Sequence, residues 1–319
     1  MFTDFYFPSC GKGMIHGCRW DPEGTPVGVV QIVHGVAEYA ARYDEFATFL
    51  ASHGFLVVAH DHMGHGGSIG ADGTARGYFA GGWSKVVADA HRLLTYTRME
   101  CPEVPYILLG HSMGSFVVRS LMARYPKCGL SAVILSGTGW MHRGILNSGI
   151  AAATLVGKKN GFDTPSKALT DMMFSGYNKR VEHKRTGFDW LTRDDKTVDA
   201  YIADPLCGFP VTAGLARDLF GGIKHIQEPE TLAKMRKDVP VHFIAGAMDP
   251  VGNYGSGVTQ TAQAFVKAGM EHVSVRLYPL CRHEVLNELN REEVYGNVLD
   301  WLKRQGLYMP KADSGHLDT

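Results

Sequence analysis

The sequence has no excess of charge of either sign and lacks the marks of a secreted protein. Its 319 residues include 32 basic and 32 acidic side chains, so the formal net charge is zero. Such a balance gives no sign of a nucleic acid or an acidic surface as a partner. The first nine residues, MFTDFYFPS, have neither the basic segment nor the apolar run of a secretion signal. We therefore expect a cytoplasmic protein.

Long hydrophobic runs and paired cysteines are also missing. The most apolar stretch, residues 144–157, is interrupted by Asn147 and Ser148 and is too short to span a bilayer. The six cysteines are scattered without C-x-x-C spacing, which favours free thiols in a reducing compartment. The sequence contains no P-loop, no dinucleotide-binding fingerprint and no internal repeat. We therefore expect no cofactor.

What the sequence does contain is a hydrophobic fraction of 45%, arranged in alternating strand and helix patterns. One-sided apolar spacing, typical of helices, is clearest at residues 83–100. The alternation predicts a mostly parallel sheet with helices on both faces, after an antiparallel edge within residues 1–20. Continuous apolar runs, typical of strands buried on both faces, occur at 27–33 and 55–59. Further strands are expected at 106–109, 130–135, 239–245 and 272–278.

The alternation stops after residue 139 and resumes with a helix expected near 228–237. Residues 140–209 are instead rich in methionine, aromatic residues, lysine and aspartate. This change predicts a core of residues 1–139 and 210–319 that carries an inserted unit of residues 140–209. A last helix is expected to begin at Asn290 with a capping box to Glu293.

The turn GHSMG, residues 110–114, lies between a short apolar strand and an apolar-faced helix. This G-x-S-x-G pattern is typical of a nucleophile elbow, in which the serine lies at the tip of a strained turn. The same spacing recurs at 66–70, but Ser68 lies in a glycine-rich run with no helical pattern after it. Ser112 is therefore the candidate nucleophile.

A serine nucleophile needs a base and a third group that orients the base. Both should follow later strands, because Ser112 lies at the carboxyl edge of a parallel sheet. Asp249 follows the predicted strand 239–245, and His283 follows the predicted strand 272–278. Either residue alone is more simply a turn aspartate or a surface histidine. Together, in the order Ser, Asp, His that is typical of α/β-hydrolases, they predict a catalytic triad.

The oxyanion of the tetrahedral intermediate needs two backbone N–H donors. We expect them from Met113, directly after the nucleophile, and from Val36, in the loop after the strand 27–33. Further residues are expected to contact the substrate: His34, Gly35, His111, Met173, Phe174 and Tyr177.

The run HDHMGH, residues 60–65, approaches a metal-binding pattern of metallo-β-lactamase-type hydrolases. That pattern requires an aspartate where Gly64 stands, and no second set of acidic and histidine ligands is evident. We therefore expect no metal site here. The histidines and Asp61 are instead expected to form hydrogen bonds under the active site.

These motifs together resemble the serine aminopeptidase S33-type α/β-hydrolases, and within that group the monoacylglycerol lipases and bacterial lysophospholipases. The resemblance implies an eight-stranded α/β-hydrolase sheet, with residues 140 to about 210 as a helical cap over Ser112. It also implies a carboxylic ester hydrolase for single-chain lipids that forms an acyl-enzyme and needs no cofactor. The motifs are HG at 34–35 with Glu38 and Arg42-Tyr43, DHMGHGGS at 61–68, GHSMG at 110–114, DPL at 204–206, MDP at 248–250 and RHE at 282–284.

Several other functions would use the same residues. A thioesterase, an iminopeptidase, a C–C bond hydrolase or a small-ester esterase has the same triad, and six aspartates of the inserted unit would suit an iminopeptidase. An epoxide hydrolase or dehalogenase would need an aspartate in place of Ser112. A non-catalytic binding protein on the same fold is an alternative from another class, although no triad member is missing. The sequence gives no indication of oligomeric state.

The inserted unit has more large apolar residues than a small cap needs, which predicts an acyl group of medium to long length. The same residues predict transient contact of the cap with membrane surfaces. Cys281, two residues before His283, is expected to lie near the active site and to react with thiol reagents. A buried, inert thiol, or reactivity at Cys207 instead, is the alternative.

Overall fold

The computed structural model describes residues 1–70 and 73–308. Eight strands form one sheet in the order β1-β2-β4-β3-β5-β6-β7-β8. The pairs β1–β2 and β2–β4 are antiparallel and the other five pairs are parallel, which confirms the predicted mostly parallel eight-stranded sheet. The strands are β1 (Phe2–Pro8), β2 (Met14–Trp20), β3 (Gly28–Val33), β4 (Phe55–His60), β5 (Tyr106–His111), β6 (Ala132–Ser136), β7 (Val241–Gly246) and β8 (Val273–Tyr278).

Alternate residues of the central strands enter two separate apolar cores, one on each face of the sheet. In β5, Leu108 belongs to the core that includes α2 (Trp83–Glu100), α3 (Met113–Arg124) and α9 (Ser256–Lys267). Its neighbour Leu109 belongs to the core under α1 (Asp44–Ser52) and α10 (Arg291–Arg304). Both faces are thus covered, which explains why the central strands are continuous apolar runs.

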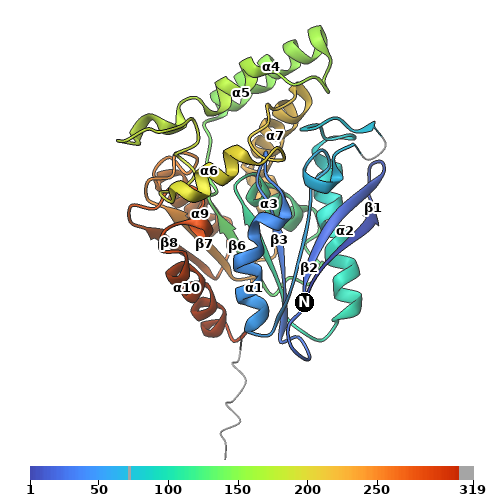
Figure 1. The fold of residues 1–319 in the computed structure, drawn as a ribbon. Coiled ribbons are helices and arrows are strands. Elements are labelled where there is room, and N and C mark those ends of the chain that lie inside the picture. Colours follow the sequence, from blue (N-terminus) through green and yellow to red (C-terminus); the bar gives the residue numbers. More distant parts are fainter. Residues whose placement is uncertain (71–72, 309–319) are drawn as a thin grey trace, which may run out of the picture.

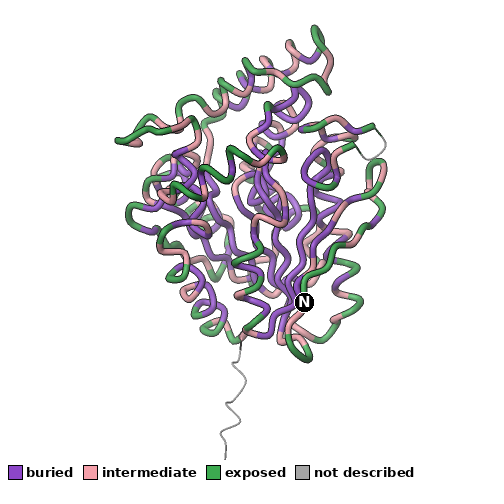
Figure 2. The backbone as a smooth tube through the Cα atoms, in the orientation of Figure 1, coloured by how far each residue is buried: buried purple, intermediate pink, exposed green. Residues whose placement is uncertain are grey.

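The chain between β6 and β7 holds five helices, and α4 and α5 lie at the top of the molecule beyond the strands (Figure 1). Exposed residues are frequent along these two helices, whereas the central strands β3 to β7 are buried (Figure 2). No helix within residues 1–70 and 73–308 is long and apolar enough to cross a membrane. The five are α4 (Arg143–Asn160), α5 (Lys167–Phe174), α6 (Asp195–Ala203), α7 (Ala213–Ile226) and α8 (Pro229–Ala233). Short 3-10 helices are η1 (Ala40–Tyr43), η2 (Gly66–Ser68), η4 (Tyr177–Arg180) and η5 (Val285–Asn287).

Two helical details differ from the sequence-based expectations. Helix α7 was not predicted, although the Thr212 hydroxyl caps it by accepting the Leu215 N–H at 3.1 Å, and the helix expected at 228–237 is limited to α8. The predicted capping box of α10 is wrong, because the Asn290 side chain accepts no hydrogen bond from the first turn. Its amide instead donates to Glu293 at 2.9 Å, while its oxygen accepts a bond from Arg193 at 2.9 Å.

Candidate active site

Ser112 lies at a strained turn between β5 and α3. Its φ of 51° and ψ of −120° are rare for a residue with a side chain. The flanking glycines are required by space, since a Cβ at Gly114 would lie 1.9 Å from the Val33 carbonyl oxygen. A Cβ at Gly110 would lie 2.6 Å from the carbonyl oxygen of Gly114. The G-x-S-x-G pattern therefore encodes a turn that holds Ser112 at the start of α3.

His283 and Asp249 lie together in the loops after β8 and β7. The Nδ1 atom of His283 is 3.0 Å from Oδ2 of Asp249, and both side chains are buried. The alignment of these two atoms is looser than that of an ideal hydrogen bond. The other Asp249 oxygen accepts the Val251 N–H at 2.8 Å. Looser alignment is common in active sites without substrate.

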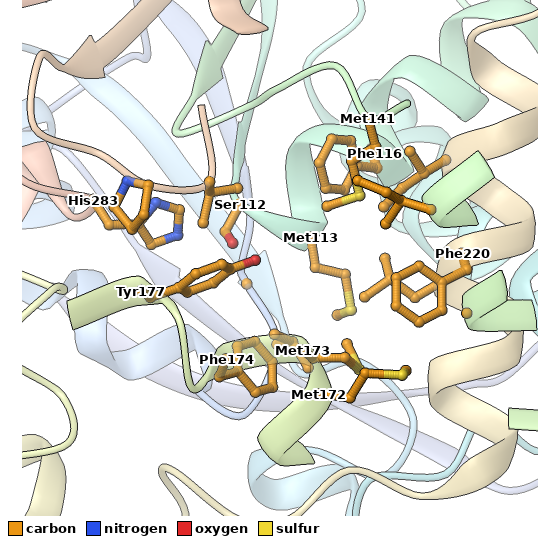
Figure 3. A pocket seen from close by; sticks show the side chains of 18 of the residues that line it. Ser112, Met113, Phe116, Met141, Met172, Met173, Phe174, Tyr177, Phe220 and His283 are labelled. Atoms are coloured by element: carbon orange, nitrogen blue, oxygen red, sulfur yellow. The ribbon is translucent and has the colours of Figure 1, made fainter. Parts of the chain in front are cut away.

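The imidazole of His283 lies against the turn that carries Ser112. Its ring centroid is 4.7 Å from the ring of His111, the residue before Ser112, and all three residues line one cavity (Figure 3). The structure thus places Ser112 and His283 at one end of that cavity, with Asp249 against the His283 ring.

The charges around His283 favour its protonated form. Burial alone would lower the pKa of His283, but the carboxylates of Asp249, Glu284 and Glu38 outweigh burial and raise it above the ordinary value. His111 differs, because burial and the adjacent His283 hold its pKa well below the usual range. His283 is therefore suited to take up a proton, whereas His111 stays neutral.

The two expected oxyanion donors border the same cavity. Met113 is the first residue of α3, and the N–H groups of a first helical turn have no partner within the helix. Val36 follows Gly35, where a Cβ would lie 3.1 Å from the Cβ of Ser112. The loop with Gly35 is thus close enough to Ser112 to direct a backbone N–H at a bound carbonyl oxygen.

The cavity, of about 1420 Å³, extends from Ser112 and His283 into an apolar space. Figure 3 shows Tyr177 near the Ser112 end and methionine and phenylalanine side chains further along. Five of the six predicted contact residues line it, namely Gly35, His111, Met173, Phe174 and Tyr177. The lining also includes Phe116, Met141 and Phe220, which no sequence motif marks.

Comparison with known proteins adds an independent finding. The profile of the family described as "Serine aminopeptidase, S33" matches residues 24–290. The chain belongs to this family. A monoacylglycerol lipase of Mycolicibacterium smegmatis is 32% identical over 89% of this chain and 90% of that protein. A monoglyceride lipase of Rattus norvegicus is 28% identical over 86% of this chain and 84% of that protein.

Solved structures agree with the sequence comparison. A thermostable carboxyl esterase from Bacillus coagulans, in complex with glycerol, superposes with a TM-score of 0.85 at 28% identity. The superposition covers 95% of this chain and 98% of that one. The predicted α/β-hydrolase fold and the S33 resemblance are thereby confirmed.

In this S33 hydrolase, a partly buried arginine connects the Gly35 loop to the His283 loop. Arg42 bonds to Glu38 at 2.6 Å and makes two bonds of 2.8 Å to the carboxylate of Glu284, next to His283. Glu38 also accepts the N–H of Gly35. Burial would raise the pKa of Glu284, but Arg42 outweighs it and lowers the pKa to about 2. The motifs contained these residues, yet only the fold reveals that they meet.

His34 lies beneath the site rather than in the cavity lining. It is fully buried, its Nδ1 is 2.7 Å from the Gly35 carbonyl oxygen, and its Nε2 accepts the His62 N–H at 2.9 Å. Burial lowers the pKa of His34 to about 3, so the ring is neutral. Asp61 likewise accepts bonds from Ala40 and Gly67 N–H groups at 2.7 Å, as expected of a supporting side chain. We therefore omit His34 from the proposed substrate contacts.

The prediction of an accessible Cys281 is wrong. The residue is fully buried, its Sγ lies 3.1 Å from the Asn290 side-chain oxygen, and burial raises the pKa of the thiol. Cys207 is also buried, and burial raises its pKa as well. Neither thiol has the exposed, thiolate-favouring surroundings of a reactive cysteine.

Proposed function

We propose that this chain hydrolyses carboxylic esters of single-chain lipids, monoacylglycerols above all, through an acyl-enzyme on Ser112. The observation that carries the proposal is the placement of Ser112 and His283 at one end of a cavity that continues between methionine and phenylalanine side chains. The monoacylglycerol lipase and carboxyl esterase relatives support an ester hydrolase of this kind.

The proposed reaction begins when His283 takes the proton of the Ser112 hydroxyl as its oxygen attacks the ester carbonyl. The backbone N–H groups of Val36 and Met113 stabilise the resulting oxyanion. His283 then returns the proton to the departing glycerol oxygen, which leaves the acyl group on Ser112. A water molecule, deprotonated by the same imidazole, releases the fatty acid. Asp249 orients the ring and stabilises its charged form.

We propose residues 140–209 as the cap over Ser112, with residues 1–139 and 210–319 as the core. Helix α4 has exposed apolar side chains at Ile145 and Leu155 and carries Lys158 and Lys159 in its last turn. Apolar and basic side chains on one exposed helix suit transient contact with an anionic lipid surface, from which a monoacylglycerol would enter.

The cavity supports a substrate with a medium to long acyl chain. Its volume exceeds the roughly 300–1,000 Å³ of ordinary small-ligand pockets. Burial of each methylene group contributes about 0.8 kcal/mol. That energy corresponds to about a fourfold gain in kcat/KM per methylene group until the cavity is full.

An iminopeptidase would need free carboxylates in the cap to hold an amine, and most cap aspartates are already engaged. Asp189 accepts N–H bonds from Arg185 at 2.6 Å and Thr186 at 2.8 Å. Asp195 and Asp199 pair with Arg185, each at 2.8 Å. These contacts favour an ester over an aminoacyl substrate. The cytoplasmic location also remains a proposal, supported by six free cysteines.

Substitution of Ser112 by Ala tests the proposal. We expect Ser112→Ala to lose fluorophosphonate labelling and about 10⁶-fold in kcat on a monoacylglycerol. Ser68→Ala is the matched control, because the Ser68 hydroxyl donates to the Asp61 carbonyl oxygen at 2.9 Å and accepts the His16 N–H at 2.9 Å. It should label normally. Labelling of the Ser112→Ala protein would overturn the proposal, and faster turnover of aminoacyl arylamides than of esters would replace the substrate class.

A further inference from the structure

A short cap segment, residues 189–194, is bonded directly to the loop that carries His283. We call this segment the strap. The His283 N–H donates to the Trp190 carbonyl oxygen at 3.3 Å, and the Glu284 N–H donates to the Leu191 carbonyl oxygen at 2.7 Å. The Trp190 ring also lies over the imidazole, with 5.1 Å between centroids and a 40° tilt. The strap therefore contacts both the backbone and the ring of His283.

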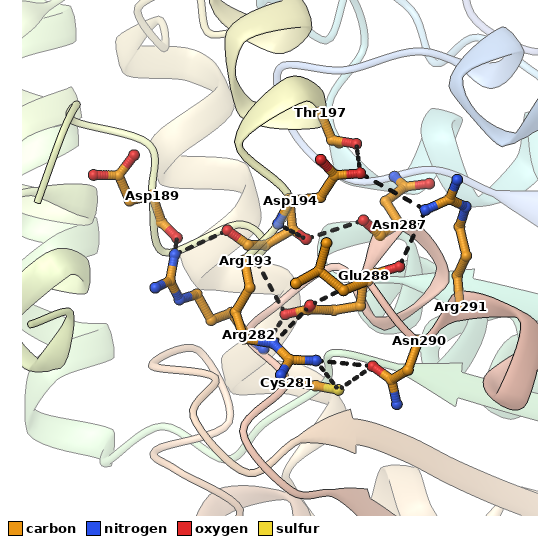
Figure 4. A network of polar contacts seen from close by, with 12 residues as sticks. Asp189, Arg193, Asp194, Thr197, Cys281, Arg282, Asn287, Glu288, Asn290 and Arg291 are labelled. Carbon is orange, nitrogen blue, oxygen red and sulfur yellow. Dashed lines mark hydrogen bonds and ion pairs between the residues drawn. The ribbon is translucent and has the colours of Figure 1, made fainter. Parts of the chain in front are cut away.

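Arg282, the residue before His283, binds the strap from the core side. Its guanidinium NH1 donates to the carbonyl oxygens of Asp189 at 2.6 Å and Thr192 at 2.9 Å (Figure 4). These two carbonyls flank Trp190, so one side chain fixes the strap on both sides of the residue that covers His283. The Thr192 hydroxyl adds a bond to the Asn287 carbonyl oxygen at 3.0 Å.

A fully buried carboxylate, Glu288, completes the attachment. One oxygen accepts the backbone N–H of Arg282 at 2.8 Å and that of Arg193 at 3.2 Å. The other accepts the Arg193 Nε–H at 2.9 Å (Figure 4). Glu288 thus joins the His283 loop and the strap through one carboxylate, with the Arg193 charge as its counterion. Buried charged hydrogen bonds of this kind hold geometry firmly.

We propose that Arg282 and Glu288 are positioning residues, which hold the strap so that it fixes the orientation of His283. Asp249 contacts His283 only at Nδ1, at 3.0 Å. The strap adds contacts to the backbone of His283 and to the face of its ring. The inference rests on the proposed function, because it assigns the strap a task in that reaction.

The test compares Arg282→Ala with Arg282→Lys and with Arg185→Ala. Arg185 lies in the cap just before the strap, and its guanidinium pairs with Asp195 and Asp199 rather than with the His283 loop, so its removal is the matched control. We expect Arg282→Ala to lower kcat by about 10- to 100-fold, with little change in KM, because small misplacement of a catalytic group has that cost. Fluorophosphonate labelling of Ser112 should slow by a similar factor. Lysine, which can still donate to both carbonyls, should restore most of the rate.

A structural role alone would give a different pattern. If Arg282→Ala matches Arg185→Ala in kcat and labelling rate, or if only KM changes, the inference is overturned. Should Arg282→Ala fold poorly by thermal denaturation, Glu288→Gln keeps the volume of the side chain and removes the charge, and it must show the same loss of kcat. Fluorophosphonate labelling of the wild type at Ser112 tests the proposed function by itself. If the wild type is not labelled, the proposed function fails; if it is labelled but Arg282→Ala behaves like Arg185→Ala, only the inference about the strap fails.

Discussion

Two segments of the proposed cap, the strap and helix α4, are attached to the core by different kinds of contact. The strap is joined to the His283 loop by polar bonds, several of them to buried groups. Helix α4 instead packs on α7 through close apolar contact. The Phe220 ring of α7 is so near Gly149 of α4 that a Cβ at Gly149 would lie 2.7 Å from it. Ile145 and Leu155 of α4 are 62% and 70% exposed.

This difference suggests a division of tasks within one insertion. Directional polar bonds specify one geometry, which suits a segment that orients a catalytic base. Apolar contacts adapt to a flexible chain, which suits the side chains of α4 and α5 around the acyl cavity. Changes in the strap should therefore alter kcat for every ester, and changes in α4 or α5 should alter the dependence on chain length.

The largest effect within the cap is expected from Trp190→Ala. This substitution removes the ring that lies over His283 and should lower kcat by about 100-fold for short and long esters alike. It should also lower the free energy of unfolding by about 3–5 kcal/mol, because Trp190 is buried. Trp190→Phe retains an aromatic ring and should lose less. Equal kcat in wild type and Trp190→Ala would remove the strap from the account.

A smaller effect is expected where α4 meets α7. Gly149→Ala forces a methyl group against Phe220, which lines the cavity, and should cost about 1–3 kcal/mol in unfolding free energy. Hydrolysis of long acyl esters should fall more than that of short ones. Gly221→Ala, on α7, is the control because a Cβ there meets nothing within 4 Å. Equal losses for short and long esters would contradict the assigned task of α4.

The smallest effect is a shift in pH dependence from Glu284→Gln. The Glu284 carboxylate helps to raise the pKa of His283, so its neutralisation should lower that pKa. His283 acts as a base only when neutral, and kcat/KM is lost as the pH falls through its pKa. The acidic limb of the profile should therefore move to lower pH in Glu284→Gln. The uncompensated Arg42 cation would act in the same direction, so a shift to higher pH, or no shift, would contradict this electrostatic role of Glu284.

The sequence predicted the sheet, the elbow and the proximity of the triad because each depends on local or periodic signals. Strands buried on both faces read as apolar runs, and Gly114 is required by its contact with Val33. Helix α7 also has such a signal, in the apolar spacing of its buried residues after Thr212.

Other features depend on contacts between distant residues. Cys281 lies close to His283 in sequence, yet its thiol points to Asn290. The same Asn290 oxygen binds Arg193, 97 positions away, which no local capping rule predicts. The strap arises from pairs separated by about 90 residues, so only the folded chain reveals it.

The most direct test of this division of tasks is a series of kcat/KM values for glyceryl esters from acetate to palmitate. It should be measured for the wild type, Arg282→Ala and Met173→Ala, whose side chain lines the cavity. Wild-type values should rise by about fourfold per methylene group until the cavity is full. Arg282→Ala should lower all values by one factor, and Met173→Ala should make the rise less steep. Wild-type values that fall beyond butyrate, or a slope altered by Arg282→Ala but not by Met173→Ala, would contradict the account.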